Sequence, residues 1–226
     1  MQDLPFGAAI DGDQLWSQIL NRPQSRPEVG GGRRAALFLD RDGVINEDTH
    51  YLHRAEDVHL IDGAAQVIAA ANRRAIPVIV VTNQAGIARG RFGWDDFIAV
   101  QEKIIDDLDR TGAFFNAVFA CPHHPDGSPP FDTPDHAWRK PNPGMLLEAA
   151  MRLPIDLKSS WLIGDRAGDL QAAKTAGLAG GIHVLTGHGK DAGERDAAKA
   201  LGGDGFQSLA AGSISGAEKL LPLLAG

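Results

Sequence analysis

A short apolar run that stops abruptly at carboxylates constrains the fold more than any other feature of the chain. Residues 36–39 are apolar, and Asp40 and Asp42 follow directly. A short apolar run bounded by charge is typical of a strand buried on both faces. Ligands bind at the carboxyl ends of the strands of an open parallel sheet, so we expect Asp40 and Asp42 at the mouth of a site. By itself, an Asp-x-Asp pair is equally compatible with an ordinary turn after a strand.

The same pattern returns along the chain, with helical segments between the apolar runs. Apolar residues at helical spacing predict helices, and β-branched runs predict strands. Asn142 and Pro143 are expected to cap one helix, and Gly177 to end another. Strands are expected at 36–39, 77–81, 116–120, 161–165 and 182–185, and helices at 63–75, from 94 onward, 143–151, 169–176 and 215–224. Strands that alternate with helices predict an α/β fold, a Rossmann-like three-layer sandwich with a central parallel sheet and no large cap domain.

Length and composition limit the number of domains. A chain of 226 residues with 43% hydrophobic content is enough for one sizeable core. We expect an N-terminal arm and linker at 1–34, with a short helix around Asp13 to Leu20. The main domain is expected at 35–226, with a Pro- and His-rich loop insertion at 121–138.

The charge pattern narrows the class of partner. A net charge of -7 without a Lys/Arg run argues against a nucleic acid or an anionic membrane as the partner. The single cysteine excludes an internal disulfide, and no apolar run approaches the length of a membrane span. We therefore expect a cytoplasmic protein, a monomer or weak oligomer, that acts on a small molecule.

Chemistry-bearing residues follow several of the expected strands. Such residues should meet at one edge of a parallel sheet. They comprise four acids, one hydroxyl and one amine: Asp40, Asp42, Thr82, Lys140, Asp165 and Asp169. Clustered carboxylates repel one another unless a cation neutralises them, and oxygen ligands suit Mg²⁺. A lysine beside that metal makes sense as a second positive charge on a bound phosphate. A carboxylate could then attack the phosphoryl group and form an aspartyl phosphate.

These residues together resemble the motifs of the haloacid dehalogenase superfamily of phosphohydrolases. Its four motifs resemble, in order, Asp40 to Val44, Thr82-Asn83, Lys140, and Gly164-Asp165 with Asp169. The resemblance implies that Asp40 is the nucleophile and Asp42 the acid/base. It also implies that Thr82 and Lys140 clamp the phosphate. Asp165 would bind Mg²⁺ together with Asp40 and the Asp42 carbonyl, with Asp169 in support.

A narrower resemblance covers roughly residues 35–185. The segments 39–46, 82–90, 121–125 and 139–141 are similar to the branch that contains histidinol phosphatases and heptose 1,7-bisphosphate phosphatases. The resemblance adds Arg41, Asn83, Arg89 and Arg139 as substrate-binding or phosphate-binding residues. Arg89 and Arg139 would contact the part of the substrate beyond the transferred phosphate.

The insertion departs from this branch, which usually has a structural zinc site there. Cys121 and His123 match the first half of the zinc motif, but the second pair of cysteines is replaced by the segment around His136. Structural zinc strongly favours four protein ligands. We therefore expect a degenerate site without stoichiometric zinc, and Mg²⁺ as the cofactor.

The residues and the two resemblances together imply a Mg²⁺-dependent phosphatase for a small sugar phosphate, and the narrower resemblance makes heptose 1,7-bisphosphate the leading substrate. Histidinol phosphate or another small phosphomonoester is the alternative. A non-catalytic phosphate-binding module would have lost its nucleophile or its acid, whereas Asp40 and Asp42 are both present. A mutase would need an enclosing cap to exclude water, and the segments between the motifs are too short for a large one.

Overall fold

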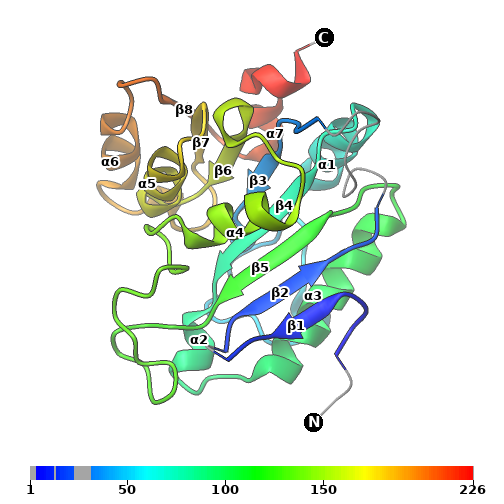
Figure 1. The fold of residues 1–226 in the computed structure, drawn as a ribbon, viewed down its shortest axis with the longest axis vertical. Helices are drawn as coiled ribbons and strands as arrows, with labels where there is room; N and C mark the ends of the chain where they lie inside the picture. The colour runs from blue at the N-terminus through cyan, green and yellow to red at the C-terminus, as the bar shows by residue number, and fades with distance from the viewer. Residues whose placement is uncertain (1–3, 13, 23–31, 226) are drawn as a thin grey trace.

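The computed structural model describes residues 4–12, 14–22 and 32–225. Its centre is one eight-stranded sheet in the order β1-β2-β5-β4-β3-β6-β7-β8 (Figure 1). Strands β5, β4, β3, β6, β7 and β8 run parallel to one another. The pairs β1–β2 and β2–β5 are antiparallel. The strand bounds are β1 Ala8–Ile10, β2 Trp16–Ile19, β3 Leu37–Leu39, β4 Val78–Asn83, β5 Ala117–Cys121, β6 Trp161–Gly164, β7 Gly180–Val184 and β8 Gln207–Ala211.

Helices cover both faces of this sheet. The α-helices are α1 Ala64–Arg73, α2 Ala85–Ala88, α3 Trp94–Asp109, α4 Gly144–Arg152, α5 Ala167–Ala176, α6 Glu194–Ala200 and α7 Ile214–Ala217. Short 3-10 helices occupy Ala55–Asp57, Leu157–Ser159, Gly187–Lys190, Glu218–Leu220 and Pro222–Leu224. In Figure 1, α4 lies in front of the sheet and α3 behind it.

Alternating residues of the buried strands build two separate cores. Leu37 and Leu39 of β3 pack in the core that includes α1, α3 and α7, whereas Phe38 packs in the core that includes α4, α5 and α6. All three side chains are fully buried. The predicted three-layer α/β sandwich is therefore confirmed, because successive side chains of a strand point to opposite faces. No helix in the described part of the chain is long and apolar enough to cross a membrane.

The N-terminal segment is a hairpin rather than a helix, so the helix expected around Asp13 to Leu20 is wrong. β2 pairs antiparallel with β5, and β1 pairs with the outer edge of β2. Leu15 and Ile19 pack on one face and Trp16 on the other, which is a period of two. The Trp16 ring lies 5.9 Å from Trp94 and 5.5 Å from Phe97 of α3.

The sheet therefore runs across the expected boundary at residue 34. Most of the linker expected within 1–34, from 23 to 31, lies outside the described residues.

Two helix ends also differ from expectation. The Asn142 side chain donates to the carbonyl of His136, at 3.1 Å, and does not cap α4, whose first residue is Gly144. The helix expected at 215–224 ends at Ala217 and continues as two 3-10 turns, because Pro222 cannot donate a helical hydrogen bond. The sequence analysis did not identify α6 and β8.

Candidate active site

The carboxyl ends of the central strands open into a cavity of about 610 Å³. β3 lies between β4 and β6 in the sheet, so the residues that follow these three strands meet at one edge. The predicted residues that line this cavity are Asp40, Asp42, Thr82, Asn83, Arg89, Arg139, Lys140, Asp165 and Asp169. The sheet topology thus gathers residues that are up to 129 positions apart in the sequence, counting from Asp40 to Asp169 (169 − 40).

Lys140 is the buried cation at the floor of the cavity. Its Nζ lies 2.9 Å from an Asp40 oxygen and 2.7 Å from an Asp169 oxygen, and it donates to the Val81 carbonyl at 2.8 Å. Burial alone would lower the pKa of Lys140, but the carboxylates of Asp169 and Asp40 outweigh burial and raise it. Lys140 therefore stays charged across the physiological pH range.

Asp40, Asp165 and Asp169 form a group of carboxylates in which one oxygen from each lies within 4.8 Å of the others. Burial raises the pKa of Asp40 to about 6, against the opposing effect of Lys140. Burial and the neighbouring charges of Asp40 and Asp169 raise the pKa of Asp165 to about 9. The single ammonium group of Lys140 cannot neutralise all three buried acids, so a further cation is needed when they are ionised. The donor set, all oxygen and without Cys or His, therefore fits Mg²⁺.

Two glycines allow the backbone to close over Asp165. Gly43 and Gly187 have φ values of 84° and 51°, and a Cβ at either position would come within 2.4 Å or 2.3 Å of Asp165 Oδ2. The same oxygen accepts a hydrogen bond from the His188 backbone N–H at 2.7 Å. Because a side chain at either glycine would collide with the carboxylate, only glycine leaves room for Asp165 at these positions.

Removal of divalent metal is expected to make stability fall as pH rises. Folding raises the pKa of Asp40 and Asp165 above 3.8, so the folded state binds more protons than the unfolded state between pH 4 and pH 9. In a chelator, the free energy of unfolding should therefore decrease from about pH 5 to pH 9. Added Mg²⁺ should stabilise the protein most at the alkaline end. Thermal unfolding across this range, with and without Mg²⁺, measures the effect, and a Mg²⁺ shift that is equal at every pH would contradict it.

Asp42 is held in a different electrostatic environment. Arg41 contacts its carboxylate through Nε at 3.1 Å and Nη2 at 2.9 Å, Asn46 donates to it at 2.9 Å, and Gln84 donates at 3.0 Å. Burial would raise the pKa of Asp42, but Arg41 and these hydrogen bonds lower it overall. The two aspartates of the Asp-x-Asp motif therefore differ in proton affinity although they are only two residues apart.

Arg41 does not occupy the position expected for a phosphate-binding residue. Its side chain is 1% exposed and does not line the cavity, and its guanidinium carbon lies 5.2 Å from the centroid of the Phe97 ring. The backbone turns back after Asp40, and the Ile45 N–H donates to the Arg41 carbonyl at 2.8 Å. The structure thus assigns the Arg41 side chain to holding Asp42, in place of the expected phosphate contact.

The end of β4 supplies a connected set of polar groups. Gln84 Nε2 donates to Thr82 Oγ1 at 2.9 Å as well as to Asp42. Asn83 exchanges two hydrogen bonds with the Lys140 backbone, at 2.9 and 3.1 Å. Gln84 is not among the residues predicted for the site. Its position directly after Thr82-Asn83 was the available signal.

Arg89 and Arg139 both line the cavity and lie close enough to each other for their charges to interact. Arg89 donates to the Tyr51 hydroxyl, lies 3.1 Å from His124 Nε2, and forms an ion pair with Asp126 at 3.2 Å. Arg139 donates to the His123 carbonyl at 2.9 Å. Burial lowers the pKa of Arg139, as does the nearby charge of Arg89. Two guanidinium groups that face one cavity provide a place for a second anionic group.

The loop after β3 and the loop after β7 meet at a histidine that the sequence analysis missed. His188 Nε2 lies 3.1 Å from Asp48, and His188 Nδ1 lies 2.7 Å from Asp191. Asp48, Arg166, His188 and Glu194 also line the cavity. His188 follows β7 on the functional edge of the sheet, which was the signal that could have identified it.

The insertion brings the residues of the expected degenerate zinc site near one another. Cys121 Sγ lies 3.9 Å from His136 Nδ1, and the His123 and His136 rings stack with centroids 4.3 Å apart. Burial raises the pKa of the Cys121 thiol to about 12, so the thiolate that binds zinc is disfavoured. Within the described part of the chain, the possible ligand atoms of these three residues do not all lie within 4.8 Å of one another, as those of the three carboxylates do. They do not fit a structural zinc site, which strongly favours four protein ligands.

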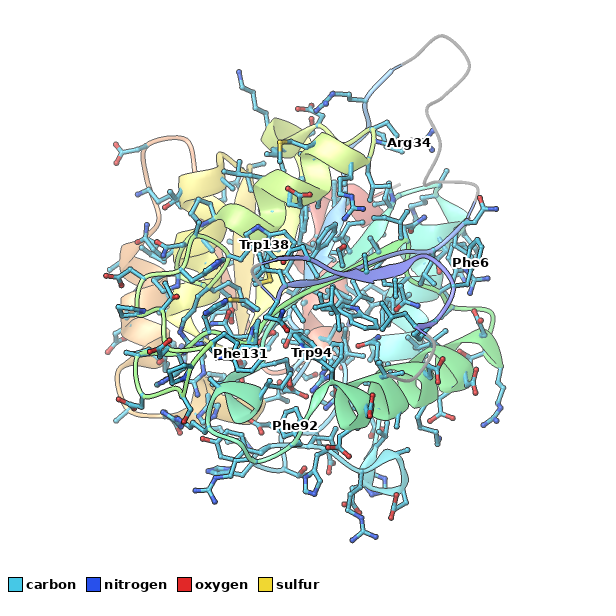
Figure 2. All side chains as sticks on the ribbon, turned by 60° about the horizontal axis from the view of Figure 1, so that its bottom comes forward. Phe6, Arg34, Phe92, Trp94, Phe131 and Trp138 are labelled. Atoms are coloured by element: carbon cyan, nitrogen blue, oxygen red, sulfur yellow. The ribbon has the colours of Figure 1, made fainter. Side chains whose placement is uncertain are left out.

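Aromatic packing helps to hold the insertion. The Trp138 ring packs edge-on against Phe119 of β5 at 5.7 Å, and His123 packs edge-on against Phe131 at 6.1 Å. Figure 2 shows Phe131 and Trp138 on the same side of the molecule, away from the labelled Phe6. The insertion is thus attached to β5 close to the cavity that contains Arg139.

Known proteins match both the sequence and the fold. The HAD-hydrolase-like family matches residues 137–204. A D-glycero-beta-D-manno-heptose-1,7-bisphosphate 7-phosphatase from Mesorhizobium japonicum is 52% identical over 146 residues, 65% of this chain and 67% of that protein. An enzyme of the same name from Rhodopseudomonas palustris is 43% identical over 148 residues, 66% of this chain and 82% of that protein.

Two solved structures share the fold. A HAD-like phosphatase from Mesorhizobium loti has a TM-score of 0.80 and 41% identity, covering 93% of this chain and 92% of that one. The D,D-heptose 1,7-bisphosphate phosphatase from B. bronchiseptica, complexed with magnesium and phosphate, has a TM-score of 0.70 and 33% identity. That comparison covers 84% of this chain and 99% of the other.

Proposed function

Because this chain belongs to the HAD-like family of D-glycero-D-manno-heptose-1,7-bisphosphate 7-phosphatases, we propose that it hydrolyses the 7-phosphate of that sugar bisphosphate. The observation that carries the proposal is the buried group of Asp40, Asp165 and Asp169 beside Lys140. A cluster of acids that faces a buried ammonium group, in a cavity at the carboxyl edge of the sheet, suits metal-assisted phosphoryl transfer.

Asp40 is the proposed nucleophile. Its carboxylate attacks phosphorus, the bond from phosphorus to the sugar oxygen breaks, and an aspartyl phosphate forms. Asp40 and Asp165, with the Asp42 carbonyl, would hold Mg²⁺, which supplies positive charge against the repulsion between the carboxylate and the phosphate. Lys140, which lies 2.9 Å from Asp40, and Thr82, which lines the same cavity, would bind the oxygens of the transferring group.

Asp42 is the proposed acid and base. In its protonated form it gives a proton to the departing sugar oxygen. The resulting carboxylate then takes a proton from the water that attacks the aspartyl phosphate, which releases inorganic phosphate and restores Asp40. Arg41, Asn46 and Gln84 hold Asp42 at the cavity wall, so the side chain must exchange some of these contacts to reach the leaving oxygen.

Arg89 and Arg139 support the choice of a bisphosphate. The transferred phosphate already has Lys140 and Thr82, whereas the guanidinium groups of Arg89 and Arg139 line the same 610 Å³ cavity and are additional to them. A substrate with one phosphate at each end would engage both groups of residues. This arrangement favours a sugar bisphosphate over a small monoester.

A panel of phosphate esters tests the proposal directly. Released phosphate would be measured in Mg²⁺ for both anomers of heptose 1,7-bisphosphate, histidinol phosphate and a simple aryl phosphate. The bisphosphate should have the highest kcat/KM of the panel. Equal use of all the esters would leave a phosphatase without the proposed substrate, and no phosphate release from any of them would overturn the proposed activity.

Arg89→Ala is expected to weaken use of the bisphosphate selectively. A charge-assisted hydrogen bond contributes roughly 1.5 to 3 kcal/mol, so kcat/KM for the bisphosphate should fall about 10- to 100-fold. The aryl phosphate should lose much less, because it has no second phosphate. Arg91→Ala, which removes an exposed arginine of the same loop outside the cavity lining, is the matched control. Equal losses for both substrates would place Arg89 at the transferred phosphate or in the scaffold.

A further inference from the structure

A second cavity, of about 260 Å³, lies between α6 and the edge of the sheet. It is lined by His183 of β7, Arg195 and Lys199 of α6, and Ser208, Leu209 and Ala210 of β8. It shares no lining residue with the larger cavity. The first residue of α6, Glu194, lines the larger cavity and accepts a hydrogen bond from the Ala167 N–H. One short helix therefore borders both cavities.

Arg195 and Lys199 give this second cavity two positive charges from exposed side chains. They are four residues apart on α6, so their side chains lie on one face of the helix. Neither side chain forms an ion pair or a hydrogen bond with another residue in the described ranges. Two like charges at this spacing destabilise a helix, and the chain as a whole carries a net charge of -7. A bound anion would turn this repulsion into attraction.

His183 adds an unsatisfied buried group. His183 is 1% exposed, and neither of its ring nitrogens makes a hydrogen bond with a described residue. Burial lowers the pKa of His183, although the nearby Asp165 backbone, which lies outside hydrogen-bond geometry, and the charge of Glu194 oppose this effect. A neutral imidazole has one N–H to donate. Because buried polar groups are normally hydrogen-bonded, its place in the cavity lining points to a ligand as the missing acceptor.

We propose that this cavity binds a phosphate group, carried by inorganic phosphate or by a small phosphorylated sugar. Arg195 and Lys199 contact the phosphate oxygens, and His183 donates its ring N–H to the ligand. Two cations match the double charge of a phosphate better than the single charge of a carboxylate, and an arginine can contact two phosphate oxygens at once. Leu209 and Ala210 provide an apolar wall for carbon atoms of a sugar ligand. The site shares no lining residue with the larger cavity, although His183 lies next to the backbone of Asp165.

The test follows the His183 ring by NMR in ¹⁵N-labelled protein. A chelator prevents turnover, the ionic strength is held constant with chloride, and inorganic phosphate and glucose 6-phosphate are titrated separately. The ring signals are assigned with His183→Gln. Saturable shifts of the His183 signals are expected, and the probe with the lower dissociation constant identifies the preferred source of the phosphate group.

Charge-matched double variants give the decisive comparison. Arg195→Ala/Lys199→Ala should raise the dissociation constant measured from the His183 signals at least tenfold. Arg73→Ala/Lys219→Ala removes the same charge from exposed positions and should leave it unchanged. The dispersion of the backbone amide signals shows whether each variant is folded.

Three results would overturn the proposal: no saturable shift of His183 with either probe, equal weakening in both double variants, or phosphate-induced shifts confined to residues of the larger cavity. None of these results bears on hydrolysis, which is measured in Mg²⁺ with the ester panel. The failure of one proposal is therefore distinguishable from the failure of the other.

Discussion

Asp40→Asn is expected to lower kcat/KM for the sugar bisphosphate by a factor of about 10⁴ or more, as loss of the nucleophile does in other covalent enzymes. An amide cannot attack phosphorus, and the substitution also removes one of the three carboxylates that lie within 4.8 Å of one another. The fold should persist. Burial already raises the pKa of Asp40 to about 6, so folding has a free-energy cost for the ionised carboxylate that a neutral amide does not have.

The measurement is phosphate release in Mg²⁺, together with the thermal midpoint in a chelator. Asp62→Asn, an exposed position outside the cavity lining, is the matched control for both measurements. The midpoint of Asp40→Asn should equal or exceed that of the parent protein. Near-normal phosphate release from a folded Asp40→Asn protein would exclude the aspartyl-phosphate mechanism.

Lys140→Met is expected to damage both activity and stability. The substitution removes a cation that contacts Asp40 and Asp169 at 2.9 and 2.7 Å and leaves both buried acids without it. Breaking a buried ion pair by removing one partner costs about 3 to 5 kcal/mol of unfolding free energy. In addition to this loss of stability, kcat of the folded variant should fall about 10²- to 10³-fold, because Lys140 would stabilise charge in the transition state as an oxyanion-hole donor does.

Denaturant unfolding in a chelator and phosphate release in Mg²⁺ measure the two effects separately. Lys103→Met is the control, because Lys103 pairs with Asp107 on the surface of α3, where an ion pair is worth about 1 kcal/mol or less. Saturating Mg²⁺ should recover part of the stability of Lys140→Met, since it supplies positive charge, but little of its activity. A variant that is inactive yet as stable as the parent protein in the chelator would show that Lys140 is not the counter-charge of these acids.

Much of the candidate site could be predicted because it consists of strand ends. Asp40 and Asp165 directly follow β3 and β6, and Thr82 lies near the end of β4. Three neighbouring parallel strands bring their ends together whatever the lengths of the connections. Lys140 does not follow a strand. Its role was implied by the family resemblance and by the need for positive charge beside the acids, and the structure places it between two of them.

The errors have a common physical origin in contacts between residues that are distant in the sequence. β2 is a strand because it pairs with β5 about 100 residues later and because Trp16 packs against α3. No local pattern in the first 20 residues contains that information. The Arg41 side chain was likewise assigned from its neighbours in the motif, whereas its position depends on Asp42 and on the ring of Phe97.

The hairpin of β1 and β2 also determines which edges of the sheet other chains can reach. Without it, β5 would present an unpaired backbone ladder of five residues, rich in apolar side chains, at the point where the insertion begins. An exposed edge of this kind is a template for intermolecular strand addition and aggregation. β1 replaces it with an edge of only three residues, too short to offer a long ladder. The hairpin thus keeps the side of the sheet beside the cavity from growing into a shared sheet with another molecule.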